Sequence, residues 1–332
     1  MATLTVLAPD GVPEVVPGDD LAALLLDVAE VADGDIVVVT SKVVSKAEGR
    51  LRPGDRDAAL AGETARVVAR RGPTAIVRTH HGLTMAAAGI DASNVAAGHV
   101  LLLPEDPDRS ARRLRRELHS RTGRTLGVLV SDTAGRAWRE GQTDIAIGAA
   151  GVVVAEDYAG RHDAHGNPLV VTAPAVADEL AGAAELASGK LGGRPFSVIR
   201  GRSDLVLPAD EDGPGARALV REEGQDLFGY GSREAVLRAL LGRDEDRTPF
   251  GTATSGPELV AALDLVAPGR VRPVESGPVE SGPLESGLVV EVTDADALTR
   301  VAAVSFASGW VVTDSGGSSD SPIRVHLRPT TP

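Results

Sequence analysis

Residues 125–144 read TLGVLVSDTAGRAWREGQTD, and this stretch says most about the fold and the site of the chain. The apolar run up to Val130 predicts a buried strand that ends in Ser131, Asp132 and Thr133, which bring a carboxylate and two hydroxyls to one edge of a sheet. Hard divalent cations and phosphates commonly bind at such an edge. The alternative is an ordinary turn in which Asp132 caps the next segment. Two arginines, a tryptophan and a glutamine follow within ten residues, and they favour a site.

Two earlier segments add residue types that suit the same chemistry. Residues 81–94, HGLTMAAAGIDASN, are rich in small residues that let a ligand approach the backbone, and they place Asp91 and Asn94 three positions apart. That pair offers a carboxylate to a cation and an amide to a nucleotide, although the same four residues are also typical of an Asx turn. Residues 34–50, GDIVVVTSKVVSKAEGR, predict a buried strand that runs into Ser41, Lys42 and Lys46. These side chains suit phosphate oxygens, or they form a solvated strand edge.

Composition excludes several classes of protein. The 332 residues are enough for two domains with hydrophobic cores. The chain has no cysteine, which rules out thiol catalysis, disulfides and cysteine-ligated metal sites. Its net charge of -13 and its 2% of aromatic residues argue against nucleic-acid binding. No apolar run reaches about 18 residues and no signal-peptide pattern opens the chain, so we expect a cytoplasmic protein that binds no membrane.

Hydrophobic periodicity predicts both helices and strands. Helices are expected over residues 21–31, 58–70, 108–120, 176–188 and 232–241, and strands over residues 36–40, 75–78, 151–155, 169–172 and 196–200. The arginines of the helix at 108–120 are interpreted as a solvated helix face rather than a phosphate site. The pair His162 and His165 lies in a predicted turn and is interpreted as a polar loop rather than as metal ligands.

The character of the sequence changes after residue 242. Residues 273–287 repeat Pro-Val/Leu-Glu-Ser-Gly three times, a period that forms no packed core and predicts an acidic, extended linker. We therefore expect a first domain over residues 1–245, a linker over 246–287 and a small appendage of unknown role over 288–332. Within the appendage we expect a helix over residues 294–308 and strands over 288–292, 310–313 and 323–327.

From about Thr5 to about Arg202 the chain resembles the coenzyme F420:L-glutamate ligase family. The three segments above carry the resemblance, together with the words GVPEV at 11–15 and GDDL at 18–21. It implies an α+β, two-lobed ligase fold with mixed sheets, to which the C-terminal residues add a small α/β appendage. It also implies a homodimeric, GTP-dependent ligase that uses Mg or Mn and responds to K. Such a ligase attaches L-glutamate to the coenzyme F420 precursor and extends a γ-linked glutamate tail.

The resemblance also implies site residues, position by position. The matches to metal ligands are Asp91, Asp132 and Thr133. The matches to nucleotide contacts are Val12, Pro13, Glu14, Val15, Ser41, Lys46 and Asn94. The loop at 188–195, with Gly189 and Lys190, falls where the family wraps the nucleotide, and Lys190 stands where the archaeal pattern has a metal-binding Gln. Because a protonated lysine cannot ligate a cation, we expect Lys190 to neutralise phosphate instead.

The implied chemistry is consistent with these residue types. Making an amide from a carboxylate requires a better leaving group than oxide, and phosphorylation to an acyl phosphate supplies one. Phosphoryl transfer depends on positioning and charge neutralisation, which aspartates with metal ions and basic side chains provide. Arg136 and Arg139 lie beside Asp132 in the sequence and are candidates to grip the precursor or the incoming glutamate. Two alternatives stay open: a flavin-dependent oxidoreductase acting on the same precursor, and a non-catalytic nucleotide-binding protein.

Overall fold

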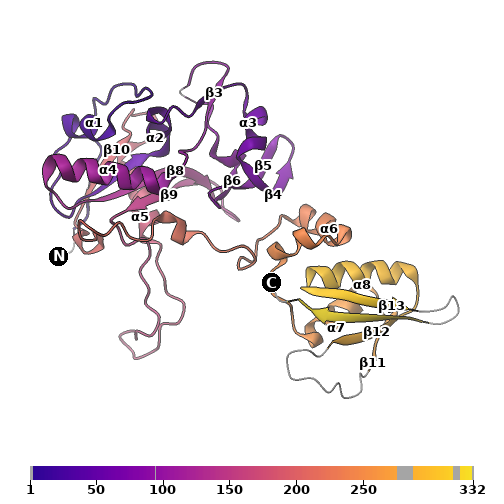
Figure 1. Cartoon of the computed structure of the whole chain (residues 1–332). Coiled ribbons are helices and arrows are strands. Elements are labelled where there is room, and N and C mark those ends of the chain that lie inside the picture. The colour runs from indigo at the N-terminus through magenta and orange to yellow at the C-terminus, as the bar shows by residue number, and fades with distance from the viewer. Residues whose placement is uncertain (1–2, 94, 275–286, 317–321, 331–332) are drawn as a thin grey trace. The chain divides into compact units, whose positions relative to one another are not determined.

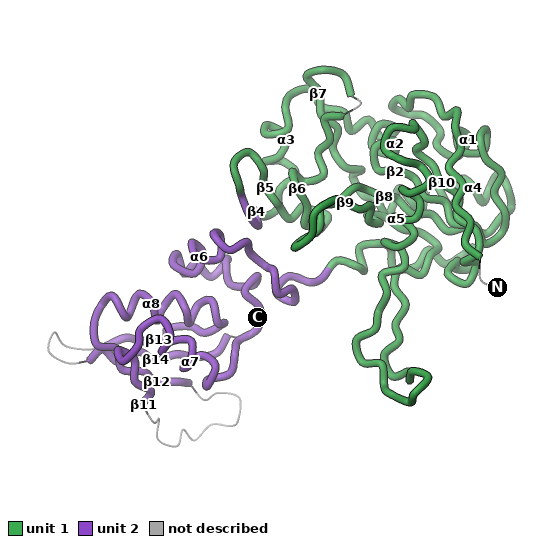
Figure 2. The backbone as a smooth tube through the Cα atoms, turned by 180° about the vertical axis from the view of Figure 1, so that it is seen from behind, with its two compact units in different colours: residues 1–67, 71–220 green, residues 68–70, 221–332 purple. Residues whose placement is uncertain are grey.

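The computed structural model of the chain describes residues 3–93, 95–274, 287–316 and 322–330 (Figure 1). The chain divides into two compact units, residues 1–67 with 71–220 and residues 68–70 with 221–332 (Figure 2). Both units combine helices with sheets, so the expected α+β class is confirmed. Within the described ranges no helix is long and apolar enough to cross a membrane.

Unit 1 is built on a five-stranded sheet with the order β1-β10-β2-β8-β9. The strands β2 and β8 are parallel and their other neighbours are antiparallel, which makes the sheet mixed. Its strands are β1 (Thr5–Leu7), β2 (Ile36–Thr40), β8 (Gly127–Gly135), β9 (Gln142–Ala150) and β10 (Phe196–Arg200). The helices that flank it are α1 (Leu21–Val28), α2 (Ser41–Ala47), α4 (Pro107–Thr122) and α5 (Val176–Ser188).

Alternate residues of β2 face two separate hydrophobic cores. Val37 and Val39 are buried in the core that also contains residues of α1, α2 and α4. Ile36 and Val38 are buried in the second core, together with residues of α5. Because both faces of the strand are covered, no position alternates to a polar residue. This is why β2 appears in the sequence as one continuous apolar run.

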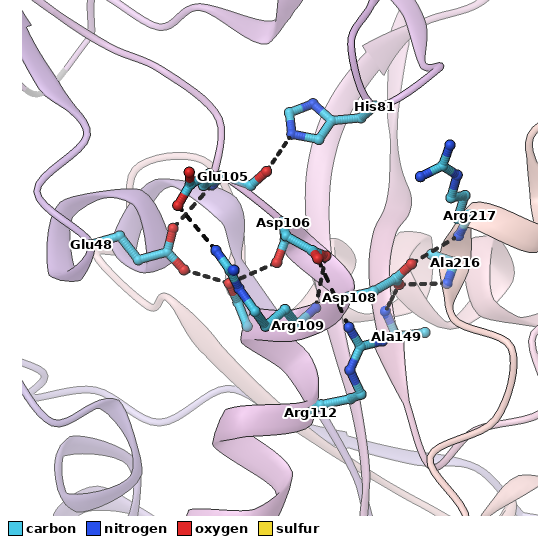
Figure 3. A network of polar contacts seen from close by, with 11 residues as sticks. Glu48, His81, Glu105, Asp106, Asp108, Arg109, Arg112, Ala149, Ala216 and Arg217 are labelled. Atoms are coloured by element: carbon cyan, nitrogen blue, oxygen red, sulfur yellow. Dashed lines mark hydrogen bonds and ion pairs between the residues drawn. The ribbon is translucent and has the colours of Figure 1, made fainter.

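Helix α4 carries the arginine-rich stretch. Arg109 and Arg113 are 60% and 74% exposed, and each forms an ion pair with a glutamate four positions away on the chain. These exposed pairs agree with the solvated helix face expected from the sequence. Figure 3 shows how the helix start is fastened: Asp108 accepts hydrogen bonds from the backbone N–H groups of Ala149, Ala216 and Arg217.

One arginine of this helix, Arg115, points inward and is 3% exposed. Its guanidinium donates hydrogen bonds to the carbonyl oxygens of Leu126, Leu207, Pro208 and Glu211. It also lies 3.2 Å from the carboxylate of Asp212. A buried cation is tolerated only when its donors are satisfied, and here they tie the segment 207–212 to α4.

A smaller region, which belongs to unit 1 except for residues 68–70, has its own sheets and core. The strands β3 (Leu51–Pro53) and β7 (His99–Leu101) pair, and a three-stranded sheet has the order β4-β5-β6. These three strands are β4 (Thr64–Arg71), β5 (Thr74–Thr79) and β6 (Thr84–Ala86). Buried Ala75, Val77, Ala88, Ile90, Val100 and Leu102 form the core.

The expected helix over residues 58–70 is only partly correct. Helix α3 (Arg56–Glu63) ends at Glu63, and β4 takes up the rest of the range. The residues beyond Glu63 include Thr64, Val67 and Val68, whose β-branched side chains favour a strand. A two-residue turn at 72–73 then returns the chain into β5, so pairing with β5 overrides the helical spacing.

The strands expected over residues 151–155 and 169–172 are wrong. The first range contributes a single bridge residue, Val152, and the second forms no strand. Figure 1 shows a long excursion between β9 and α5. Val170 and Val171 are 72% and 91% exposed there, so their side chains are not buried in a core that would stabilise a regular strand. Pro168 and Pro174 also lack the N–H that a ladder requires.

Unit 2 contains an antiparallel sheet with the order β11-β12-β14-β13. The strands are β11 (Val271–Val274), β12 (Leu288–Val292), β13 (Trp310–Gly316) and β14 (Ile323–Pro329). The helices are α6 (Ser232–Leu241), α7 (Gly256–Val266) and α8 (Ala295–Ala307). Residues of α7, α8 and the sheet share one hydrophobic core.

The expected linker over 246–287 contains structure that belongs to this core. Leu259 and Leu263 of α7 are fully buried, and β11 pairs with β12. The sequence held a signal, since Ser255 and Glu258 form a capping box at the start of α7. Most of the repeats, residues 275–286, lie outside the described residues. Apart from residues 68–70, unit 2 covers the chain from Arg221 onward, whereas the sequence placed a boundary after residue 245.

Candidate active site

The most informative carboxylate of the sequence, Asp132, lies where β2 ends and α2 begins. Thr40, the last residue of β2, is paired with Ser131 of β8, so β8 carries Asp132 beyond the end of its neighbour. Ser41 opens α2 and donates a hydrogen bond of 2.7 Å from its Oγ to Asp132 Oδ1. The expected strand end at Asp132 is wrong, because β8 continues as one arm of a hairpin with β9.

A second aspartate, Asp144 of β9, lies directly opposite Thr133 in this hairpin and is 4% exposed. Thr133 Oγ1 donates to one of its carboxylate oxygens at 2.8 Å, and Ser131 Oγ donates to the other at 3.1 Å. A buried carboxylate needs such donors or an opposite charge. The two hydroxyls on either side of Asp132 therefore fix the position of Asp144.

Burial raises the pKa of the Asp132 carboxyl to about 6. Desolvation is the largest cause, the hydrogen bond from Ser41 opposes it, and the negative charges of Asp144 and Asp91 add to it. Asp91 and Asp132 thus interact electrostatically although they are far apart in the sequence. The three aspartates form one electrostatic cluster.

Asp91 is held by backbone pairing and by a lysine of α2. Its N–H and C=O both bond to Leu101, the last residue of β7. The Lys42 ammonium lies 2.6 Å from Asp91 Oδ2. The Ser93 N–H donates to Asp91 Oδ1, which is the Asx turn that the sequence left as an alternative. Desolvation raises the pKa of the Asp91 carboxyl, but the bonds from Lys42 and Ser93 outweigh it and hold that pKa below its ordinary value.

The turn that leads into Asp91 is strained. Ala87 and Ala88 have φ values of 50° and 55°, a left-handed conformation that costs an L-residue roughly 1–2 kcal/mol. Such strain persists only where the surrounding packing imposes it. Ala88 is 2% exposed, and a Cβ on the following Gly89 would lie 2.9 Å from Leu103. The packing that imposes this turn also fixes where Asp91 stands.

Lys190 reaches the same cluster from the loop after α5. Its ammonium lies 2.7 Å from Thr133 Oγ1, 3.1 Å from Asp144 Oδ1 and 2.8 Å from Glu185 Oε1. Desolvation lowers the pKa of the Lys190 ammonium, but the bonds to Glu185 and Asp144 outweigh it and raise the pKa above its ordinary value. We call Asp91, Asp132, Asp144 and Glu185 the carboxylate cluster.

The segment expected to contact the nucleotide begins beside α2. Lys46 forms an ion pair with Glu14, so these two expected contacts lie together. Pro13 and Glu14 are exposed. Val15 is buried in the core that contains α1, and Val12 packs against the same core, so their side chains stabilise the fold.

The remaining expected residues lie in turns. Arg136 and Arg139 are exposed in the turn between β8 and β9, where Arg136 Nη2 donates to the carbonyl oxygen of Glu140. Gly189 ends α5 with a φ of 64°, a conformation that favours glycine. Asn94 lies outside the described residues.

Sequence reasoning did not assign a role to two members of this site. Asp144 and Glu185 lie on separate elements, and strand pairing and helix packing bring them together with Lys190. Lys42 was expected to meet phosphate oxygens or to lie at a solvated strand edge, and the structure places its ammonium against Asp91. Composition held a signal for the lysines. Of the 34 lysines and arginines, only three are lysines: Lys42, Lys46 and Lys190.

The residues fit a divalent cation at Asp91 and Asp132 better than at Thr133. Mg²⁺ commonly takes one or two carboxylates and fills its other positions with water and phosphate oxygens. In the part of the chain that the structure describes, no group of three or more His, Asp or Glu side chains could hold a metal by itself. The Thr133 hydroxyl already donates to Asp144 and accepts from Lys190. Asp91 and Asp132 are therefore the carboxylates that would hold the ion, which would compete with Lys42 for Asp91 Oδ2.

Comparison with known proteins identifies the family. The model of the F420-0:Gamma-glutamyl ligase family matches residues 11–65 and 53–201. The chain is 40% identical over 252 residues to the Coenzyme F420:L-glutamate ligase of Methanopyrus kandleri, an alignment that covers 69% of this chain and 100% of that protein. This chain belongs to the F420-0:gamma-glutamyl ligase family. The protein of the same name from Archaeoglobus fulgidus is 41% identical over 251 residues, which cover 70% of this chain and 97% of that protein.

Membership in this family confirms the resemblance seen in the sequence and makes the chain an enzyme, a ligase that forms a carbon–nitrogen bond. The family match ends at residue 201, directly after β10, and therefore before the main part of unit 2, residues 221–332. The carboxylate cluster and the three lysines all lie within the matched residues.

Proposed function

We propose that the chain is a GTP-dependent ligase that attaches L-glutamate to the coenzyme F420 precursor and then extends a γ-linked glutamate tail. The observation that carries this proposal is the carboxylate cluster with lysines at the end of β2. It combines carboxylates of the kind that hold a divalent cation with ammonium groups of the kind that neutralise phosphate oxygens, and phosphoryl transfer requires both. Relatives named Coenzyme F420:L-glutamate ligase, matched over 97% and 100% of their length, support the substrate class.

The first proposed step activates a carboxylate of the precursor. One of its oxygens attacks the γ-phosphorus of GTP, the bond from that phosphorus to the β–γ bridging oxygen breaks, and GDP leaves. Lys42 and Lys46 lie one helical turn apart on α2 and supply positive charge for the phosphate oxygens. Asp91 and Asp132 would hold a divalent ion, which would supply Lewis acidity for this transfer.

The second proposed step forms the amide. The amine nitrogen of glutamate attacks the carbonyl carbon of the acyl phosphate, and the carbon–oxygen bond to phosphate breaks. Inorganic phosphate leaves with the bonding electrons, and the nitrogen loses a proton. Arg136 and Arg139 are our candidates to hold the anionic precursor or the incoming glutamate, because both are exposed in the turn that follows the Asp132 strand.

Two further properties are proposed on the resemblance to the family. We expect a homodimer, which light scattering of the purified full chain measures directly. We also expect activity to respond to K, and replacing potassium by sodium at constant ionic strength tests that response.

The function is tested by incubating the full chain with GTP, Mg or Mn, glutamate and the precursor. We expect the precursor to gain glutamyl units by mass spectrometry, and GTP to be converted to GDP. Replacing GTP by ATP tests the base preference. A precursor labelled with ¹⁸O in its carboxylate tests the acyl phosphate, because one labelled oxygen then passes to inorganic phosphate. Asp91→Asn is the inactive control, and Asp163→Asn in the distant loop is the matched active control.

The same experiment separates the alternatives. A flavin-dependent oxidoreductase changes the precursor by hydrogen rather than by a glutamyl unit, and it carries a flavin that gives the protein a yellow colour. A non-catalytic nucleotide-binding protein binds GTP and leaves the precursor unchanged. Product without consumption of GTP contradicts the proposed activation step.

A further inference from the structure

Lys190 makes three contacts that together use all the donors of its ammonium. The contacts go to Thr133 of β8, Asp144 of β9 and Glu185 of α5, at 2.7 Å, 3.1 Å and 2.8 Å. An ammonium has three N–H donors and no acceptor. Three protein oxygens therefore surround the charge, in the way that oxygens surround a cation, and no N–H is left for a phosphate oxygen.

The two carboxylates that contact Lys190, Asp144 and Glu185, are largely shielded from water and are stabilised by a positive charge between them. The side chains of Asp144 and Glu185 are 5% and 20% exposed. Negative charges held this far from water are costly unless a cation pairs with them. Each of the two is ion-paired with Lys190. The desolvated carboxylate of Asp132 lies close enough to Asp144 to feel its charge, which adds to the local need for a cation.

A lysine at position 190 is unusual for this chain, whose basic residues are almost all arginines. Lysine occurs at only three positions in the sequence, and all three lie at the candidate site. A guanidinium is a flat fork that spreads its charge, whereas an ammonium is a compact point charge. Only the compact group can stand among three converging oxygens in the way a metal ion does.

We propose that the Lys190 ammonium is a resident cation of the site, which fills the position between Thr133, Asp144 and Glu185 and so excludes a divalent ion from these three oxygens. An ion bound to these oxygens at its usual distance of about 2.1 Å would coincide with the ammonium. The chain then binds its divalent ion at Asp91 and Asp132 alone. This inference rests on the proposed function only for the role of that ion.

The number of metal ions bound tests the proposal without any turnover. Mn²⁺ is titrated into the full chain without nucleotide or precursor, up to millimolar concentration, and free Mn²⁺ is measured by electron paramagnetic resonance. We expect Lys190→Gln to bind one more Mn²⁺ per chain than the wild type. The control is Arg194→Gln, which removes one positive charge from the same loop at a residue paired with Asp10, and it should bind the wild-type number. Equal numbers for Lys190→Gln and the wild type overturn the proposal.

A second measurement uses the unaltered protein, so it does not depend on the variant folding. Selective ¹³C labelling of lysine gives three ε-methylene signals, which Lys→Arg substitutions at positions 42 and 46 assign. On addition of Mg²⁺ we expect the Lys42 signal to shift as the ion competes for Asp91, while the Lys190 signal stays in place. The Lys190 side chain is 56% exposed and could swing outward. A Lys190 signal that moves saturably with Mg²⁺ to the position of a free lysine shows displacement and refutes the proposal.

Discussion

Replacing Asp132 by Asn should stabilise the metal-free protein while removing its ability to hold a divalent ion. The carboxyl of Asp132 has its pKa raised from 3.8 to about 6, chiefly by desolvation. At roughly 1.4 kcal/mol per pKa unit, ionising this group in the folded protein costs about 3 kcal/mol. Asn is uncharged and keeps an oxygen at Oδ1, so it can still accept the hydrogen bond from Ser41. We therefore expect the variant to gain up to about 3 kcal/mol in free energy of unfolding at pH 8.

The sign of this effect follows from which state holds the proton. Below pH 3.8 the Asp132 carboxyl is protonated in both states and contributes no difference. Between pH 3.8 and about 6 the unfolded chain loses the proton first, so the metal-free wild type loses stability as the pH rises. Above pH 6 the full cost is present. The advantage of Asp132→Asn should therefore grow from near zero at pH 4 to its maximum at pH 7–8.

Urea unfolding in the presence of a chelator, at pH values from 4 to 8, measures this difference. The matched control is Asp163→Asn, because hydrogen bonds from Asn167 hold the pKa of the Asp163 carboxyl below its ordinary value. That control should show a change of the opposite sign. With Mn²⁺ at 100 times its dissociation constant, the wild type should gain about 2.7 kcal/mol and Asp132→Asn should gain nothing. A pH-independent difference, or a variant less stable than wild type at pH 8, would refute the electrostatic reasoning.

Three further outcomes are expected. Arg115→Ala should lower the free energy of unfolding by about 3–5 kcal/mol, because it leaves several buried carbonyl groups and a carboxylate without their donor. The control Arg113→Ala, which breaks an exposed ion pair, should change the free energy of unfolding by less than about 0.5 kcal/mol. Similar losses for both variants would contradict the role of burial. Ala87→Gly should raise the free energy of unfolding by about 0.5–1 kcal/mol by relieving a left-handed φ of 50°; a drop in thermal stability would show that the turn is not strained. Periodate-oxidised GTP, which reacts with amines, should label the chain at Lys42 or Lys46, and unmodified GTP should block this labelling, as peptide mapping checks. Label confined to the N-terminal amine would be incompatible with nucleotide binding at these two lysines.

The sequence predicted a strand or helix correctly where the hydrophobic pattern within that element was enough to define it. The apolar run of β2 and the spacing of α4 and α5 gave those elements to within a few residues of their observed limits. The errors fall where distant pairing decides. At β4 a helical spacing lost to pairing with β5, and at Asp132 an apparent strand end continued because β9 lies alongside.

The candidate site divides in the same way. Residue types and their order were enough to propose Asp91, Asp132, Ser41 and Lys46 as site residues. They were also enough to detect the resemblance to a ligase family, because a family's motifs are defined by the linear order of residues. Which charge meets which oxygen is not such a property. The contact of Lys190 with Asp144 and Glu185 depends on the register of a hairpin and on the direction in which α5 ends. A pKa near 6 for Asp132 depends likewise on how much water the folded chain removes from one carboxylate, because desolvation and Coulomb energies follow distances in space rather than separation along the chain.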